Sequence, residues 1–339
     1  DPDIKSDSYQ STNIHAKTSR FFFTTSTDTD VGNISTRIEL DFILSAQGDE
    51  RISNSEASRL RHAFVKWQYG ENSSILAGQT WSTFFNVGAL PDLQDFVGPV
   101  GTIFNRQPMI RWSPGPIDIA LENPFTRLND TEYDTTGDPV GALDVRDDSE
   151  VMPDIVLRYN ANWGSLGWSM AAIGRELSYE DRGDGGNTQN DDDSEYGYGL
   201  SLAGKWMIGR DDIRFMFNYG NARGRYMALN GFNDGYIDAD GNIETFDQYG
   251  GFIAYRHLWS DHWRSNFSLS MAEADNPDSS DVPLVGGYAK TYQSAHVNLQ
   301  YVPTPALMFG GEFIYATKEL EDKRKGSLSR FQFSVKYGF

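Results

Sequence analysis

The sequence predicts an all-β protein, a transmembrane antiparallel β-barrel, from three observations. Residues 330–339 alternate strictly, with Phe, Phe, Val, Tyr and Phe at odd positions and Arg, Gln, Ser, Lys and Gly at even ones. Short and long connections alternate along the chain, as in barrels whose turns and loops lie on opposite sides of a membrane. No apolar run approaches the roughly 18 residues of a spanning helix, and the mean hydropathy of -0.52 suits strands with one polar face.

Each expected strand is a segment in which apolar side chains recur at every second position. The second one is representative, because Ile38 and Leu40 lie on one face while Arg37, Glu39 and Asp41 lie on the other. The expected strands comprise 11–26, 34–45, 61–70, 75–81, 105–112, 117–125, 153–163, 166–178, 196–208, 213–220, 246–259, 262–274, 288–301, 306–317 and the closing segment 330–339.

The connections are rich in Gly, Pro, Asn, Asp and Ser, the residues that favour turns. The short turns comprise 27–33, 70–74, 113–116, 164–165, 209–212, 260–261 and 302–305. The long connections comprise 46–60, 82–104, 126–152, 179–195, 221–245, 275–287 and 318–327. A soluble β-sandwich, such as an adhesin or a lectin, is the alternative fold, but it has no reason to alternate short and long connections.

We expect residues 1–339 to form one barrel domain of about fifteen recognisable strands. An odd number makes the first strand run in the same direction as the closing one, so that both end in the periplasm. Because bacterial single-chain barrels have an even number of strands, we expect one further strand upstream of Asp1, giving about 16 in the native protein. Residues 1–10 would then belong to the first external loop.

Composition and motifs argue against several classes of function. The formal net charge of -19 disfavours nucleic acid as a partner. The chain has no cysteine, which excludes disulfides and thiolate metal sites. Its five histidines form no spaced ligand pair with a nearby carboxylate, and no Gly-x-Ser-x-Gly motif occurs. We therefore expect no metal, no cofactor and no enzymatic activity; a barrel enzyme such as a lipase or protease is the alternative.

If the apolar side of each strand faces lipid, the other side faces a water-filled lumen. The acidic residues assigned to that side are fewer than the basic ones, and comprise Glu39, Asp41, Asp118, Glu122 and Glu312. The basic residues comprise Arg20, Arg37, Arg111, Arg158, Arg175, Lys205, Arg214, Arg256, Arg264, Lys290, Arg330 and Lys336. Arg61 and Arg106 conflict with simple alternation and are left unassigned.

A tube lined by Arg and Lys favours the passage of anions, and the planar guanidinium matches a carboxylate bidentately. The basic residues therefore predict a pore for small anionic solutes, and carboxylates in particular. The alternative is that these side chains pair with lumenal acids and only brace the wall.

The segment 82–104 is the third external loop when the upstream strand is counted. It is too apolar for a solvated outer loop, and we expect it to fold into the lumen and narrow it. The residues expected at this constriction are Phe84, Phe85, Asp92, Asp95 and Phe96. The alternative is a loop that covers a neighbouring subunit or latches across the top of the barrel.

Several short motifs resemble those of Gram-negative general porins. They comprise Ser19-Arg20-Phe21-Phe22-Phe23, Asp30-Val31-Gly32-Asn33, Ile38-Glu39-Leu40, Arg61-His62-Ala63-Phe64-Val65 with Gly78-Gln79, and Tyr337-Gly338-Phe339. Within that group the whole sequence resembles the DcaP-like porins, a family associated with the uptake of dicarboxylic acids. A general porin without selectivity is the alternative.

The resemblance implies a homotrimer in the bacterial outer membrane, in contact with its lipid and lipopolysaccharide, and an N-terminal periplasmic segment with coiled-coil character. It also implies an arginine cluster opposite the third loop, for which Arg20, Arg37 and Arg111 are the matching positions. The chain departs from some enterobacterial porins in lacking a Pro-Glu-Phe-Gly-Gly motif in that loop, so the resemblance does not specify how the loop folds.

Overall fold

A computed structural model of the chain describes residues 9–43, 57–133, 139–147, 149–180, 192–227, 231–238, 241–279 and 282–339. Fifteen strands of these residues form one sheet. They are β1 (Phe21–Thr29), β2 (Gly32–Asp41), β3 (Arg59–Gly70), β4 (Ser73–Trp81), β5 (Arg106–Pro114), β6 (Ile117–Glu122), β9 (Asp154–Trp163), β10 (Leu166–Glu180), β11 (Asp192–Ile208), β12 (Asp211–Gly220), β15 (Gln248–Leu258), β16 (Trp263–Ala274), β17 (Ala289–Thr304), β18 (Leu307–Leu320) and β19 (Lys325–Tyr337).

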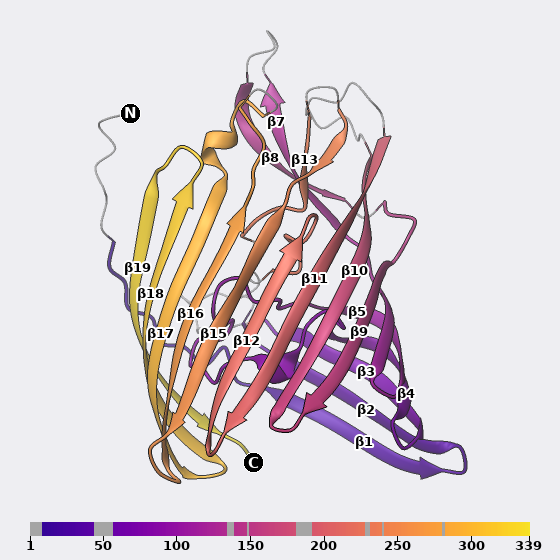
Figure 1. Cartoon of the computed structure of the whole chain (residues 1–339), viewed down its shortest axis with the longest axis vertical. Coiled ribbons are helices and arrows are strands. Elements are labelled where there is room, and N and C mark those ends of the chain that lie inside the picture. Colours follow the sequence, from indigo (N-terminus) through magenta and orange to yellow (C-terminus); the bar gives the residue numbers. More distant parts are fainter. Residues whose placement is uncertain are drawn as a thin grey trace.

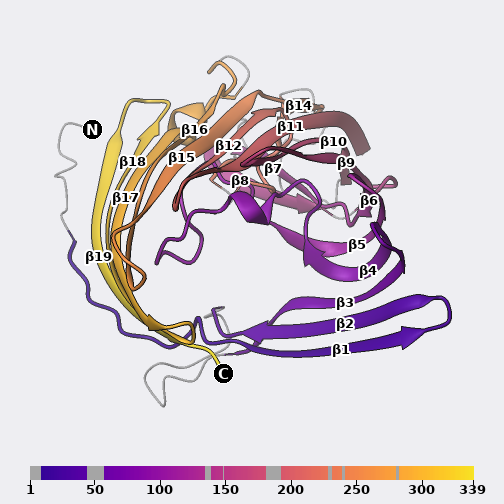
Figure 2. The same ribbon diagram turned by 60° about the horizontal axis from the view of Figure 1, so that its bottom comes forward.

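The sheet has the meander topology of a barrel wall. Its order follows the chain from β1 to β19, and β6 pairs with β9 and β12 with β15 where the intervening strands leave the wall. Every neighbouring pair is antiparallel, as the β10–β11 and β17–β18 pairs illustrate. Figure 2 shows this sheet curving around a central space. The predicted all-β, barrel-type architecture is confirmed, and the expected upstream strand stays a prediction.

The two faces of the wall differ in chemistry as the alternating pattern predicts. In β9, Ile155, Leu157 and Tyr159 are exposed on the outer face. Asp154 is buried on the inner face, and Arg158 on the same face is half-buried. The same alternation places apolar side chains outside on the other strands of the wall, which is the surface that lipid would cover. The described residues include no helix that is long and apolar enough to cross a membrane.

Two of the expected loops contain strands instead, which corrects the sequence interpretation. The segments 126–152 and 221–245 contribute a second, four-stranded sheet in the order β14-β13-β7-β8. Its strands are β7 (Thr126–Tyr133), β8 (Pro139–Asp147), β13 (Gly235–Ile237) and β14 (Ile243–Thr245). Figure 1 places this external sheet at the end of the barrel opposite the C-terminus.

The external sheet forms because segments far apart in the sequence share a small apolar core. Leu128 of β7, Ile237 of β13 and Ile243 of β14 pack against Leu177 and Tyr179 at the outer end of β10. Burial of these side chains stabilises strands too short to be stable alone. A single-segment pattern cannot show this pairing, because β13 joins β7 in parallel across more than a hundred residues.

The long connection between β4 and β5, which contains residues 82–104, lies inside the curved sheet (Figure 2). It contains a short 3₁₀ helix, η1 (Val87–Ala89), and its Phe84 and Phe85 side chains are each 1% exposed. Gly101 has a φ of 71°, and a Cβ there would lie 2.3 Å from the Met271 carbonyl oxygen of β16. Only glycine allows this backbone to approach the wall so closely. The predicted fold of this inward loop into the lumen is confirmed.

Candidate functional site

One end of the inward loop is held by two arginines of the wall. Arg111 on β5 donates from Nε to the Thr83 hydroxyl at 2.7 Å and from Nη2 to the Trp81 carbonyl at 2.6 Å. Arg158 on β9 donates to the Phe85 carbonyl at 3.0 Å and pairs with Asp118 at 2.7 Å. Both guanidinium groups are thus engaged in positioning the loop.

The other end of the loop is held by strands from the opposite part of the chain. Glu312 on β18 accepts hydrogen bonds from the backbone amides of Gln94 at 2.8 Å and Asp95 at 3.1 Å. Arg264 on β16 pairs with Asp92 at 2.7 Å, and Arg330 on β19 pairs with Asp95. The loop therefore crosses the lumen and is tied to both sides of it.

Five arginines gather beside this loop at the outer ends of β1, β2, β3 and β5. We call them the N-terminal arginine cluster, which comprises Arg20, Arg37, Arg59, Arg61 and Arg106. Arg59, Arg61 and Arg20 lie within electrostatic reach of the Arg106 guanidinium. Clustering of like charges in a partly buried space costs free energy unless an anion compensates it.

Only two carboxylates among the described residues pair with this cluster. Arg61 contacts both of them, with 2.7 Å to Glu39 and 2.7 Å to Asp41. Arg59 pairs with Asp41 at 2.8 Å, and Arg20 lies 3.9 Å from Glu39. Arg37 donates from Nε to Glu39 at 3.0 Å. Five cations and two anions leave a formal excess of three positive charges.

Phe96 of the inward loop covers one side of the cluster. Its ring centroid lies 5.3 Å from the guanidinium carbon of Arg61, 5.5 Å from that of Arg20 and 5.8 Å from that of Arg59. The negative face of an aromatic ring attracts such cations. Arg20 and Arg37 keep 44% and 34% of their side-chain surface exposed, so that a solute can reach them.

A second basic group lies at the opposite end of the lumen, near the short turns of β11, β12 and β15. Asp212 is fully buried and pairs with Arg256 at 2.5 Å, with Arg214 at 2.7 Å and with Lys205 at 3.8 Å. Arg214 also donates to the Leu90 carbonyl of the inward loop. Three cations share one carboxylate here.

Two further sequence-predicted basic residues form ion pairs away from these two groups. The Arg175 guanidinium is fully buried and pairs with Asp154 at 3.2 Å and Asp234 at 2.7 Å. Lys290 pairs with Glu321 at 3.1 Å near the long-loop end of β17. The structure thus divides the predicted basic lining into exposed clusters and buried or rim-located ion pairs.

Sequence reasoning missed Arg59 and left Arg61 and Arg106 unassigned, although all three belong to the cluster. The cause at Arg61 is a register shift, because Glu39 pairs with His62 whereas Leu40 pairs with Leu60. This bulge turns Arg61 inward beside Arg59 and breaks the alternation. Arg106 begins β5 and lies 4.4 Å from the Trp81 ring centroid. One signal in the sequence could have found Arg59 and Arg61: they flank the apolar Leu60, and residues two apart in a strand point to the same face.

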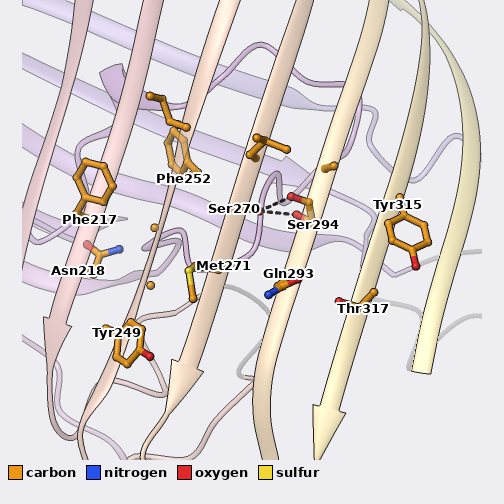
Figure 3. A pocket seen from close by; sticks show the side chains of 15 residues that line it. Phe217, Asn218, Tyr249, Phe252, Ser270, Met271, Gln293, Ser294, Tyr315 and Thr317 are labelled. Atoms are coloured by element: carbon orange, nitrogen blue, oxygen red, sulfur yellow. Dashed lines mark hydrogen bonds between the residues drawn. The ribbon is translucent and has the colours of Figure 1, made fainter. Parts of the chain in front are cut away.

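A cavity of about 620 Å³ lies over β12 and β15–β18, and Figure 3 shows its lining. Tyr249, Leu269 and Tyr315 belong to the exposed outer face of the wall. The cavity therefore faces the surroundings of the barrel rather than the arginine cluster. The described residues contain no group of three or more His, Cys, Asp or Glu side chains that could hold a metal ion.

Comparison with solved structures finds barrels of the same architecture. The outer membrane channel DcaP of Acinetobacter baumannii matches with a TM-score of 0.74 and 20% identity over 96% of this chain and 86% of that one. An anion-selective porin from Comamonas acidovorans matches with a TM-score of 0.56 and 10% identity over 95% and 90% of the two chains. The trimer form of OmpT from Vibrio cholerae matches with a TM-score of 0.53 and 10% identity over 94% and 96%.

No curated protein matches the sequence. The profile of the DcaP outer membrane protein family, however, matches residues 2–339, which is nearly the whole chain. The family is one of outer membrane proteins, which places this protein in the bacterial outer membrane, and its structural neighbours are channels and porins of the same fold. The chain belongs to the DcaP outer membrane protein family.

Proposed function

We propose that this channel is selective for small anionic solutes, and for dicarboxylates in particular. The observation that carries the proposal is the N-terminal arginine cluster beside the inward loop, in which Glu39 and Asp41 pair with four guanidinium groups and the fifth, that of Arg106, lies close to them. Fixed positive charge in a narrow, partly desolvated passage concentrates anions and repels cations. Arg20 and Arg37 are the most exposed of the four members that pair with Glu39 or Asp41, and they are therefore the ones that meet the solute.

The size of the positive excess favours selectivity over mere bracing of the wall. In a bracing arrangement each guanidinium has its own carboxylate, as Arg158 has Asp118. In the cluster, Glu39 and Asp41 are each shared by two or more arginines. A dicarboxylate supplies two negative charges and four acceptor oxygens, which suits a group of forked donors.

The assembly is proposed to be a homotrimer, in which residues 1–339 of each subunit belong to one barrel. The trimer form of a structural neighbour supports this assembly. The exposed apolar residues of the wall, such as Phe331 and Phe333 of β19, provide the surface that outer-membrane lipid and lipopolysaccharide would contact. The structural neighbour from Comamonas acidovorans is an anion-selective porin, which agrees with the proposed selectivity.

Swelling of proteoliposomes tests the proposal against a general, non-selective porin. Succinate and its neutral diamide have nearly the same size and differ in charge. We expect succinate to enter proteoliposomes faster than the diamide, because the cluster attracts the carboxylates. Equal rates for the two solutes would favour a general porin, and faster entry of a diamine of similar length would contradict anion selectivity.

A further inference from the structure

A second cavity lies on the inner face of the wall, on the side of the inward loop that faces the short turns. Its volume is about 430 Å³, within the range of small-molecule sites. It is bounded by the loop at Asn86 and by the β9–β10 turn, and Lys205 of β11 lines its wall. Figure 1 shows the β11–β12 turn at the same end of the barrel as the C-terminus of the chain. The cavity is thus separate from the N-terminal arginine cluster, which occupies the outer ends of the strands.

Lys205 is the charged group of this cavity, and it is poorly paired. Its ammonium lies 3.8 Å from Asp212, near the limit for an ion pair. Arg214 and Arg256 approach the same carboxylate more closely, at 2.7 Å and 2.5 Å. The three cations and one anion leave a formal excess of two positive charges. An anion in the cavity would therefore gain attraction from Lys205 without displacing an existing strong pair.

The other polar groups of the cavity are neutral. The Asn162 amide and the Ser165 hydroxyl are exposed on the cavity wall and make no side-chain hydrogen bond to the part of the chain that the structure describes. Asn86 is held in place, because its Nδ2 donates to the Ser169 hydroxyl at 2.7 Å and its Oδ1 accepts from the Gly88 amide at 3.0 Å. The cavity thus combines one ammonium with a free amide and a free hydroxyl.

We propose that this cavity is a second solute site, which binds a small carboxylate that carries a hydroxyl group. Lys205 attracts the carboxylate, and Asn162 and Ser165 exchange hydrogen bonds with the hydroxyl. A site built to hydrogen-bond a hydroxyl discriminates against the analogue that lacks it, because its polar groups are then left unpaired. The inference rests on the proposed anion selectivity. It adds a second binding site for the solute at the periplasmic end of the lumen.

The site is tested by measuring solute binding as fluctuations of the ion current through the full chain in planar bilayers. Malate and succinate, which differ by one hydroxyl, are added separately to the short-turn side and to the long-loop side of oriented channels. We expect Lys205→Gln to weaken malate binding from the short-turn side by at least about tenfold, as for the loss of one charge-assisted hydrogen bond. We expect Asn162→Ala to weaken malate binding more than succinate binding.

Lys318→Gln is the matched control, because it removes the same charge from β18, where Lys318 lies over the Tyr292 ring. It should leave malate binding from the short-turn side unchanged. Unchanged malate binding in Lys205→Gln, or an equal loss in Lys318→Gln, would overturn the second site while leaving a wild-type anion preference intact. A wild-type channel that prefers cations would overturn the proposed function as well.

Discussion

The N-terminal arginine cluster and the Arg175 network are both rich in arginine, but their charges are balanced differently. Around Arg175, two aspartates face two arginines: Arg175 pairs with Asp154 and Asp234, and Arg225 lies 3.7 Å from Asp154. In the cluster, five arginines stand against two carboxylates, and four of the five pair with them. The first group is neutral and buried, whereas the second is positive and partly exposed. Charge balance and exposure, rather than residue type, thus separate bracing arginines from those that meet solute.

The two groups have different roles in the same barrel. The Arg175 guanidinium also donates to the carbonyls of Phe125 and Ala222, each at the base of a segment that enters the external sheet. Tyr226 donates to Asp154 at 2.6 Å, and Gln107 donates to the Tyr226 hydroxyl at 2.6 Å. The network therefore joins the external sheet to the wall beside the inward loop. It sets the shape of the lumen, and the cluster sets its charge.

The largest expected effect is on stability, from Arg175→Ala. The change leaves Asp154 and Asp234 buried without their principal cation, which costs about 3–5 kcal/mol for a broken buried pair. We expect a large fall in the thermal unfolding temperature of the detergent-solubilised protein. Arg175→Lys, which keeps the charge but not the fork, should lose less. An unaltered unfolding temperature in both variants would contradict the structural role assigned to the Arg175 network.

The next effect is on selectivity, from the double variant Arg20→Glu with Arg37→Glu. It reverses two exposed charges of the cluster, and we expect the anion-to-cation permeability ratio to fall by roughly tenfold, equivalent to about 1.4 kcal/mol. Stability should fall less than in Arg175→Ala, because Glu39, the buried partner of both residues, keeps its ion pair with Arg61. Arg324→Glu in the β18–β19 connection, together with Lys325→Glu at the first residue of β19, is the charge-matched control. An equally large fall in the permeability ratio of that control would contradict the assignment of selectivity to the cluster.

A smaller effect is expected from Phe96→Ala in the inward loop. The change removes the ring that faces Arg20, Arg59 and Arg61, where each cation–π contact is worth about 0.5–1 kcal/mol at an exposed site. We expect a higher single-channel conductance with the preference for anions retained, because the passage widens while its charge stays. Phe331→Ala, on the outer face of β19, should leave conductance unchanged. An unchanged conductance in Phe96→Ala would place the ring outside the passage.

The smallest effect concerns the external sheet and pH. Burial raises the pKa of Asp144, but the hydrogen bonds from Arg127 and Arg146 outweigh it and hold the pKa below its ordinary value. A depressed folded-state pKa gives stability that is present above the unfolded value of roughly 3.9 and is lost as the pH falls below it. Hydrogen exchange should therefore show weaker protection of β7 and β8 near pH 3 than at pH 6. Asp144→Asn should abolish that pH dependence.

The sequence predicts the wall well because the wall obeys a local rule. Alternation places Ile155, Leu157 and Tyr159 outside without knowledge of any partner strand. The inward loop was predictable for a similar reason, since Phe84 and Phe85 are too apolar for a solvated connection. The cluster was only partly predictable, because the bulge at Arg61 depends on how β2 and β3 pair. The external sheet was missed, since its core comes from Leu128, Leu177 and Ile237, which lie far apart in the sequence and meet only in the folded chain.

The central claim is that unbalanced guanidinium groups beside the inward loop make the lumen prefer anions. The reversal potential of the wild-type channel across a potassium chloride gradient, measured at neutral pH and low ionic strength, tests it most directly. Low salt matters because the Debye length is about 30 Å at 0.01 M and about 3 Å at 1 M. A reversal potential of the sign set by chloride, which shrinks towards zero at high salt, is the predicted result. A sign set by potassium under the same gradient would contradict the account.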